Sequence, residues 1–307
     1  MDIVVSGSLA YDRIMEFPGS FSDHILPEKI HVLNVSFTVS SLVEHLGGTA
    51  GNIAYALRLL GEEPTIAATI GRDYQRYFEW LSKNDISFDS IDIVDEEFTA
   101  GAYITTDRAD NQITGFNPGA MKHPSSFDFD RVDPKKCIVI IAPGNLQDMA
   151  TYSQDCKSRG IDYIFDPGQS LPMWDGEALA RCIDGSRLLV SNDYELDLIE
   201  SRTGLSQGEL LARTGAIVTT LGEKGSRVQA PESTVDVPAI KSKGVVDPTG
   251  AGDAYRAGLI RGLIQGETLE RGALMGSVCA SFAIEQHGTQ EYQFTMEEFY
   301  SRLDSAG

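Results

Sequence analysis

Short apolar runs alternate with helix-like segments along most of this chain, and that alternation restricts its possible folds more than any other feature. The runs predict buried strands at residues 3–6, 65–70, 137–142, 161–165, 187–190 and 216–220. Between the first two runs, Gly61 is a plausible helix C-cap after a segment in which apolar residues recur at helical spacing: Ile53, Ala56, Leu57 and Leu60. Strands that alternate with helices predict right-handed βαβ units. We therefore expect an α/β fold with a mainly parallel sheet and helices on both faces.

Two stretches interrupt the alternation. Residues 12–46 contain strand-like pieces at 13–17 and 31–37, and residues 98–118 include a hairpin whose strands, 102–106 and 112–116, flank a polar turn. Both stretches predict a small β-sheet that projects from the α/β core of a single domain spanning residues 1–307. The pattern alone is equally compatible with a lid over a site and with a β-extension that has no role in function.

The last third of the chain is expected to be mostly helical. A hairpin is predicted through residues 226–237, and Thr295 and Glu298 have the spacing of a capping box that starts a final helix.

The charge balance and the cysteines narrow the possible partners. With 25 basic and 45 acidic residues the net charge is −20, which argues against a nucleic-acid-binding surface but not against a nucleotide held by local backbone amides. No closely spaced pair occurs among the four cysteines, Cys137, Cys156, Cys182 and Cys279, as expected for reduced thiols in a cytoplasmic protein. Neither a signal-peptide pattern nor a long apolar segment is present, so we expect no membrane span.

Residues 247–253, Asp-Pro-Thr-Gly-Ala-Gly-Asp, form a glycine-rich turn in front of a helix-like run. Glycines let backbone N–H groups approach an anion closely, and the helix start adds partial positive charge. Such a turn can hold a transferring phosphoryl group, while Asp253 is placed to take a proton from an attacking hydroxyl. An ordinary turn capped by Asp253 is the alternative.

Four other segments place polar groups where a ligand could bind. Asp12 follows the first strand and can accept hydrogen bonds from vicinal hydroxyls, as a sugar presents. A second glycine pair, Gly47 and Gly48, opens a helix with Asn52 in its first turn. Asn192 and Glu195 start another helix, where Glu195 could organise Mg²⁺ through waters or simply belong to a helix cap. The turn at 220–225 can wrap the phosphates or ribose of a nucleotide, or be a plain β-turn.

Together these motifs resemble, in order and over essentially the whole chain, the ribokinase-like (pfkB-type) family of sugar and nucleoside kinases. The most specific match is residues 247–253, in which Pro248 replaces a threonine of the family pattern. Within the family, the resemblance to bacterial adenosine kinases is greatest in six stretches: 7–12, 17–22, 26–28, 116–121, 191–195 and 288–291. Ser8 is a departure, since many sugar kinases carry asparagine there.

The resemblance implies a three-layer αβα sandwich with a mainly parallel central sheet and a small β-sheet lid. It implies ATP-dependent phosphorylation of the 5′-hydroxyl of adenosine with Mg²⁺. A monovalent cation is a further candidate cofactor, and a homodimer through the lid is expected. Asp253 would be the catalytic base, and the anion hole would be formed by the amides of Gly250, Ala251, Gly252 and Asp253. The ribose would be held by Ser8, Asp12, Gly48 and Asn52, and the base would be covered by Ser36, Tyr103, Phe116 and Gln169. ATP would contact Asn192, Thr220, Gly222 and Gly225, with Glu195 ordering Mg²⁺ through water.

Two rival functions remain open on the sequence: a sugar kinase of the same family, acting on ribose or fructose, and a non-catalytic nucleoside-binding protein on this fold. The presence of Asp253 with both glycines disfavours the second, because a pure binder has no need of a base. A dinucleotide-dependent oxidoreductase is disfavoured because the first strand is followed by Gly7-Ser8-Leu9-Ala10 and not by GxGxxG.

Overall fold

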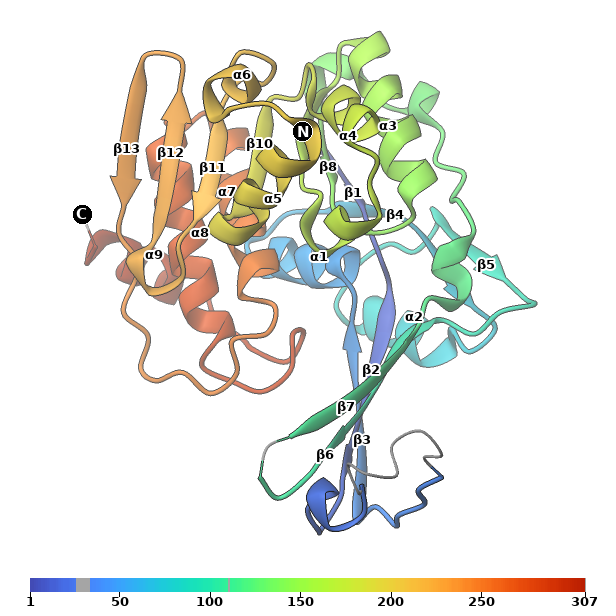
Figure 1. Ribbon diagram of the computed structural model, residues 1–307. Helices are drawn as coiled ribbons and strands as arrows, with labels where there is room; N and C mark the ends of the chain where they lie inside the picture. The colour runs from blue at the N-terminus through green and yellow to red at the C-terminus, as the bar shows by residue number, and fades with distance from the viewer. Residues whose placement is uncertain (26–33, 110, 307) are drawn as a thin grey trace.

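The computed structural model describes residues 1–25, 34–109 and 111–306, and its main feature is a nine-stranded sheet (Figure 1). The strand order is β13-β12-β11-β10-β9-β8-β1-β4-β5. Neighbouring strands from β11 to β5 are parallel, and β12 and β13 add an antiparallel edge. The strands are β1 (Asp2–Ser6), β4 (Pro64–Gly71), β5 (Ile91–Val94), β8 (Cys137–Ile141), β9 (Asp162–Phe165), β10 (Leu188–Asn192), β11 (Ile217–Thr220), β12 (Ser226–Ala230) and β13 (Ser233–Val237). All six predicted strands and the 226–237 hairpin are confirmed, whereas the short β5 was not predicted.

Helices cover both faces of this sheet and complete the predicted three-layer αβα sandwich. On one face lie α1 (Thr49–Leu59), α2 (Gln75–Lys83), α7 (Ala251–Ile264), α8 (Leu269–Ala283) and α9 (Met296–Asp304). The other face carries α3 (Leu146–Arg159), α4 (Gly176–Ile183), α5 (Asp193–Thr203) and α6 (Gln207–Leu211). Successive strand residues supply the two cores alternately: Ile3 and Val5 face the first layer and Val4 the second. The capping box of Thr295 and Glu298 starts α9, as predicted.

Short 3₁₀ helices connect several of these elements, at Phe21–Asp23, Gly119–Lys122, Phe129–Arg131, Pro134–Lys136, Gly168–Met173 and Gly222–Lys224. Within the described residues, none of the helices combines the length and apolar character that a membrane crossing requires.

A second sheet, the small sheet, projects from the sandwich (Figure 1). Its strand order is β3-β2-β6-β7, formed by β2 (Ala10–Glu16), β3 (Ser41–Gly47), β6 (Ala100–Thr106) and β7 (Gln112–Asn117). The predicted 102–116 hairpin is confirmed as β6 and β7. The strand expected at 31–37 is wrong for residues 34–37, which carry no strand, while residues 31–33 and the stretch 26–28 lie outside the described residues.

The small sheet has two faces of different character. Cross-strand register places Asp12 beside Ala102 and His45, and Ala102 beside Phe116, so these residues share what we call the Asp12 face. Register places Arg13 beside Glu44 and Tyr103 on the opposite face, the Arg13 face. Side chains alternate between the faces of a strand, so the two sets cannot line the same pocket.

The four cysteines are free and buried in the two cores, in agreement with the expected reduced thiols. Cys279 belongs to the layer of α7 and α8, and the other layer contains Cys137, Cys156 and Cys182.

Candidate active site

The glycine turn at 247–253 ends in the N-terminus of α7, as predicted. Gly250 is the N-cap with φ 77° and ψ −2°, a left-handed conformation that glycine adopts without strain. The N–H of Ala254 donates to the Gly250 carbonyl at 3.0 Å and that of Ala251 to the Pro248 carbonyl at 3.3 Å, while helix geometry directs the N–H groups of Gly252 and Asp253 out of the helix end. A Cβ at Gly252 would lie 2.7 Å from Nη1 of Arg256. At Gly250 and Gly252 the turn therefore exposes its backbone without a side chain, as close approach of an anion requires.

Asp253 lies half-buried in the first turn of α7. Its Oδ2 accepts a hydrogen bond of 2.8 Å from Nδ2 of Asn52, which projects from the first turn of α1. Burial raises the pKa of Asp253, and the charge of Glu195 adds to this, whereas Arg256 and the Asn52 bond oppose it. A carboxylate with one oxygen bound and a raised pKa is suited to accept a proton.

A cavity of about 330 Å³ opens in front of this turn. Most of the motifs predicted from the sequence meet here, since the cavity is lined by Thr49, Pro143, Asp166, Gly168, Gln169, Asn192, Glu195, Thr220, Gly222, Gly250, Gly252, Asp253 and Arg256. The structure thereby brings together segments from four strand ends (β8, β9, β10 and β11) and three helix starts (α1, α5 and α7).

Asp166 and Arg256 are charged cavity residues that were not predicted from the sequence. They form a buried ion pair in which Arg256 Nη2 donates to Asp166 Oδ1 at 2.9 Å. Asp166 and nearby carboxylates raise the pKa of Arg256, although burial opposes this, so the guanidinium stays charged. A signal did exist in the sequence: Arg256 lies one helical turn after Asp253, and Asp166 directly follows a buried strand.

Asn192 and Glu195 form a reciprocal capping box at the start of α5. The N–H of Asn192 donates to Glu195 Oε2 at 2.8 Å, and the N–H of Glu195 donates to Asn192 Oδ1 at 2.7 Å. Burial raises the pKa of Glu195 despite the Asn192 bond, and the charge of Asp166 adds to this effect. The cap interpretation is thus correct, and the same carboxylate also faces the cavity.

The acidic lining of this cavity fits Mg²⁺ held through waters by Glu195. The other two carboxylates, those of Asp166 and Asp253, accept hydrogen bonds from Arg256 and Asn52. Among the residues that the structure describes, no cluster of three His, Cys, Asp or Glu side chains is arranged to hold a metal directly. Mg²⁺ commonly keeps several waters and binds proteins through one or two carboxylates together with substrate phosphates.

A second cavity of about 600 Å³ adjoins the first and shares Thr220, Gly222 and Gly252 with it. Its wall is largely apolar and includes Ile240, Val245, Ala251, Tyr255, Ala280 and Ile284. Gly225 lies in the same wall with φ 92°, and a Cβ there would be 2.1 Å from the Val237 carbonyl oxygen. Pro248 also lines this cavity, so the residue that departs from the family pattern contributes apolar surface to it.

Asp12 and the glycine pair at 47–48 meet at the base of the small sheet. A Cβ at Gly47 would lie 2.7 Å from Asp12 Oδ2, so the missing side chain makes room for the carboxylate. Gly48 has φ 91°, and a Cβ there would be 2.5 Å from the carbonyl oxygen of Ser8. Burial raises the pKa of Asp12, with His45 lowering it and Asp247 of the glycine turn raising it. The Asp12 face is therefore the one turned toward α7.

Ser8 differs from its predicted place among ribose ligands. Its hydroxyl oxygen accepts the Thr49 N–H at 3.1 Å, and its own N–H donates to Thr49 Oγ1 at 3.1 Å. Ser8 is buried, and its hydroxyl accepts a hydrogen bond from the N-terminus of α1. It thereby joins the end of β1 to the start of α1.

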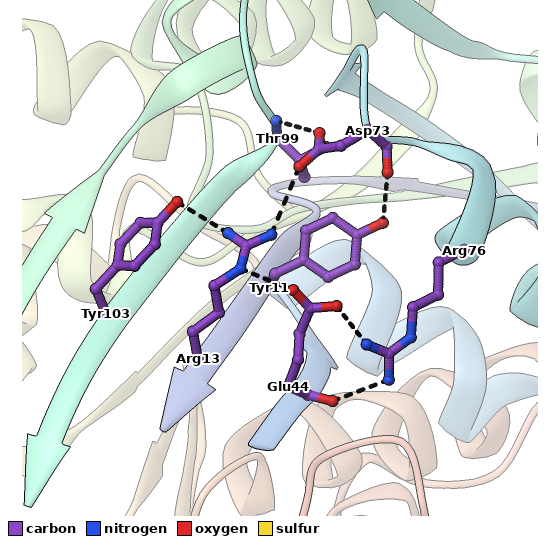
Figure 2. Close-up of polar contacts among 7 residues, drawn as sticks. All are labelled: Tyr11, Arg13, Glu44, Asp73, Arg76, Thr99 and Tyr103. Carbon is purple, nitrogen blue, oxygen red and sulfur yellow. Dashed lines mark hydrogen bonds and ion pairs between the residues drawn. The ribbon is translucent and has the colours of Figure 1, made fainter. Parts of the chain in front are cut away.

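Tyr103 lies on the wrong face for the role predicted for it. Figure 2 shows Arg13 between the rings of Tyr11 and Tyr103, with Arg13 Nη1 donating to the Tyr103 hydroxyl at 3.0 Å. Phe116, in contrast, is exposed on the Asp12 face, because it pairs with Ala102 and not with Tyr103. Side chains alternate along each strand, so counting residues from the hairpin turn would have placed Tyr103 and Phe116 on opposite faces of the sheet.

The two remaining residues predicted to cover the base, Gln169 and Ser36, lie in different parts of the structure. Gln169 lines the same cavity as Asp253 and the glycine turn, and not the Asp12 face. Ser36 is exposed in the segment between β2 and β3, and the structure does not bring it to either cavity.

Comparison with known proteins agrees with this geometry and defines the class as a ribokinase-like kinase. The nucleoside kinase of Burkholderia thailandensis in complex with inosine is 36% identical, with a TM-score of 0.87 over 99% of this chain and 97% of that one. The same enzyme in complex with ADP-inosine is 37% identical, with a TM-score of 0.85 over 99% and 95%. The nucleoside kinase of Methanocaldococcus jannaschii is 33% identical over 282 residues, or 90% of this chain and 91% of that protein.

Residues 11–295 match the pfkB family of carbohydrate kinases. The chain belongs to this family and is an ATP-dependent kinase.

Proposed function

We propose that this kinase transfers the γ-phosphoryl group of ATP to the 5′-hydroxyl of a purine nucleoside, with adenosine as the first candidate. The observation that carries the proposal is the half-buried Asp253 carboxylate at the N-terminus of α7, which lines the 330 Å³ cavity together with the glycine turn. The inosine-bound relative supports a nucleoside as the acceptor.

The acceptor would bind on the Asp12 face of the small sheet. Asp12 accepts hydrogen bonds from the vicinal ribose hydroxyls, and the flat base lies against an apolar row with Phe116. Register shows that this row contains Ile14, Val43 and Ile104. The small sheet then acts as a lid, which keeps water from accepting the phosphoryl group in place of the nucleoside.

ATP would occupy the larger cavity, with its γ-phosphate at the glycine turn. Thr220, Gly222 and Gly225 line the wall that contacts the nucleotide. Mg²⁺, ordered through waters by Glu195, would supply charge neutralisation to the phosphates.

In the reaction, Asp253 Oδ1 takes the proton of the 5′-hydroxyl as the oxygen attacks the γ-phosphorus and the bond to ADP breaks. The N–H groups of Gly250, Gly252 and Asp253 would face the equatorial phosphoryl oxygens, and that of Ala251, which donates to the Pro248 carbonyl at 3.3 Å, would have to turn from it to join them. Arg256 and the helix start add positive charge, so the chain stabilises the transition state by positioning and electrostatics.

The test compares turnover on adenosine, inosine, ribose and fructose with purified protein and ATP. We expect turnover on the nucleosides, and Asp253→Asn to lower kcat by at least about a hundredfold with little effect on folding. Activity confined to the free sugars would refute the nucleoside assignment, and near-normal turnover of Asp253→Asn would refute the base.

A further inference from the structure

A chain of hydrogen bonds runs from Asp253 back to the small sheet. Asn52 Nδ2 donates to Asp253 Oδ2 at 2.8 Å, and Gln290 Nε2 donates to Asn52 Oδ1 at 3.0 Å. Gln290 Nε2 also donates to the Tyr77 hydroxyl at 2.8 Å, and that hydroxyl donates to the Gly47 carbonyl at 2.7 Å. The chain thus joins α7, α1, the segment before α9, α2 and the end of β3.

The Gly47 carbonyl, at the end of this hydrogen-bond chain, determines which group donates and which accepts in every other bond. A carbonyl oxygen can only accept, so at 2.7 Å the single proton of the Tyr77 hydroxyl must lie on the Gly47 side. Burial raises the pKa of Tyr77, which keeps that proton in place. Tyr77 can then only accept from Gln290, which must present its amide nitrogen.

The same logic continues to the carboxylate. With its nitrogen between Tyr77 and Asn52, Gln290 donates to both, so Asn52 must present its oxygen to Gln290. The amide nitrogen of Asn52 is left facing Asp253. An N–H donor stabilises the ionised form of a carboxyl group, whereas an amide oxygen there would stabilise the protonated form.

Gly51 shows that the chain is built into the packing. Glycine in a helix interior is less stable than alanine, because its backbone loses more conformational freedom on folding. A Cβ at this buried position of α1 would lie 1.9 Å from the Tyr77 hydroxyl and 2.8 Å from Gln290 Nε2. Glycine at this position therefore lowers the stability of the helix but leaves space for the Tyr77 hydroxyl and the Gln290 amide.

We propose that Gln290, oriented through Tyr77 by the Gly47 carbonyl, is a positioning residue that keeps Asp253 in its proton-accepting form. This inference rests on the proposed role of Asp253 as base. Gln290 acts through Asn52 and does not touch the reacting atoms.

The hydrogen-bond chain stabilises the ionised form of Asp253, which most of the neighbouring groups disfavour. Glu195 on α5 and Asp166 after β9 are acidic neighbours, and Tyr77 and Tyr292 are buried hydroxyls near it. Arg256 is the cation that faces it among these groups, and it is already paired with Asp166. A fixed N–H donor therefore matters for the protonation state.

Two variants test the proposal through the pH dependence of kcat/KM, measured with the nucleoside that the wild type phosphorylates. In Gln290→Glu the ionised side chain can only accept, so Asn52 is expected to turn its oxygen toward Asp253. We expect the acid limb to move up by about one pH unit, which corresponds to about a tenfold loss on that limb and recovery at alkaline pH. Tyr77→Phe adds no charge but removes the anchor, and should move the limb the same way, with a loss of about two- to tenfold. KM for ATP should be unchanged in both.

The protein contains a second, similar arrangement that serves as a matched control. Tyr55 donates to the Tyr292 carbonyl at 2.7 Å and accepts from Gln293, the same arrangement with no bond to Asp253. Tyr55→Phe and Gln293→Glu should keep the wild-type acid limb.

Equal losses at every pH, or a wild-type profile in a folded Tyr77→Phe or Gln290→Glu protein, would overturn the positioning role. If one variant fails to fold, the other decides alone. A fully active Asp253→Asn would overturn both the base and this inference, whereas an inactive Asp253→Asn with wild-type profiles in the two variants would overturn the inference alone.

Discussion

Arg256 is the residue on which the electrostatics of the site depend most. Its side chain is about 8% exposed, the Asp166 side chain about 1%, and each has the other as its opposite charge. Breaking a buried pair by removing one partner is more damaging than never having had it, because a bare charge remains.

Arg256→Met should therefore lower the free energy of unfolding by about 3–5 kcal/mol, since Asp166 is left buried and unpaired. Urea denaturation measures the change. Adding Asp166→Asn should restore most of the stability but not kcat, because the cation facing the phosphoryl group is still missing. A double variant as unstable as Arg256→Met would contradict this account.

The titration of Asp253 gives a second prediction at the residue scale. Its pKa is raised above the ordinary value, first by burial. Below that raised pKa the group is protonated and cannot accept a proton, so kcat/KM should fall as the pH drops through it. The acid limb should thus lie above the usual range of an aspartate, about pH 3.9, and disappear from the residual activity of Asp253→Asn. A profile that is flat down to pH 4 would contradict it.

At the scale of elements, the small sheet is held to the sandwich by the Arg13 face. Arg13 Nε donates to Glu44 Oε2 at 2.7 Å, and its Nη2 lies 3.6 Å from Asp73 Oδ2, in the turn that precedes α2. Asp73 Oδ1 in turn accepts from the N–H of Thr99, just before β6, at 2.7 Å. These contacts, together with Arg76 of α2, join β2, β3 and the start of β6 to the turn before α2 (Figure 2).

Arg13→Met should raise KM for the nucleoside about five- to tenfold and leave KM for ATP nearly unchanged, because a looser small sheet affects only the acceptor side. Steady-state kinetics with each substrate varied in turn measures this. Arg227→Met is the matched control, since Arg227 makes a similar cross-strand pair with Asp236 on the distant edge hairpin. Equal changes in both KM values would argue against a lid.

Strands buried on both faces were predictable from continuous apolar runs, and the two hairpins from a turn between strand-like segments. The half-exposed strand β3 was not predicted, because it carries Glu44 and His45, polar side chains whose partners lie elsewhere in the chain. The same limit explains the missed site residues. Arg256 and Asp166 are 90 positions apart, and nothing local in the sequence indicates that they meet. The glycine turn was predictable because its function depends on consecutive residues.

At the scale of the whole molecule, the small sheet leaves large apolar side chains uncovered. Leu42 is 62% exposed and Ile113 47% on the Arg13 face, and in the part of the chain that the structure describes no further strand pairs with the edge strands β3 and β7. Exposed apolar surface on an open sheet is typical of a protein interface.

We therefore expect a homodimer through the small sheet, with twice the chain mass in light scattering. Leu42→Glu with Ile113→Glu should yield monomers, because the charges would be buried unpaired in the interface. A wild-type protein that is monomeric at assay concentration would remove this expectation.

The four buried cysteines can be used to detect local unfolding of the protein. Burial raises the pKa of the Cys137 thiol to about 12 and also raises those of the other three, so little thiolate exists near neutral pH. An alkylating reagent should then modify the native protein only when a layer opens. Since Cys279 lies on one side of the sheet and the other three on the opposite side, the order in which mass spectrometry finds them labelled would show which layer detaches first.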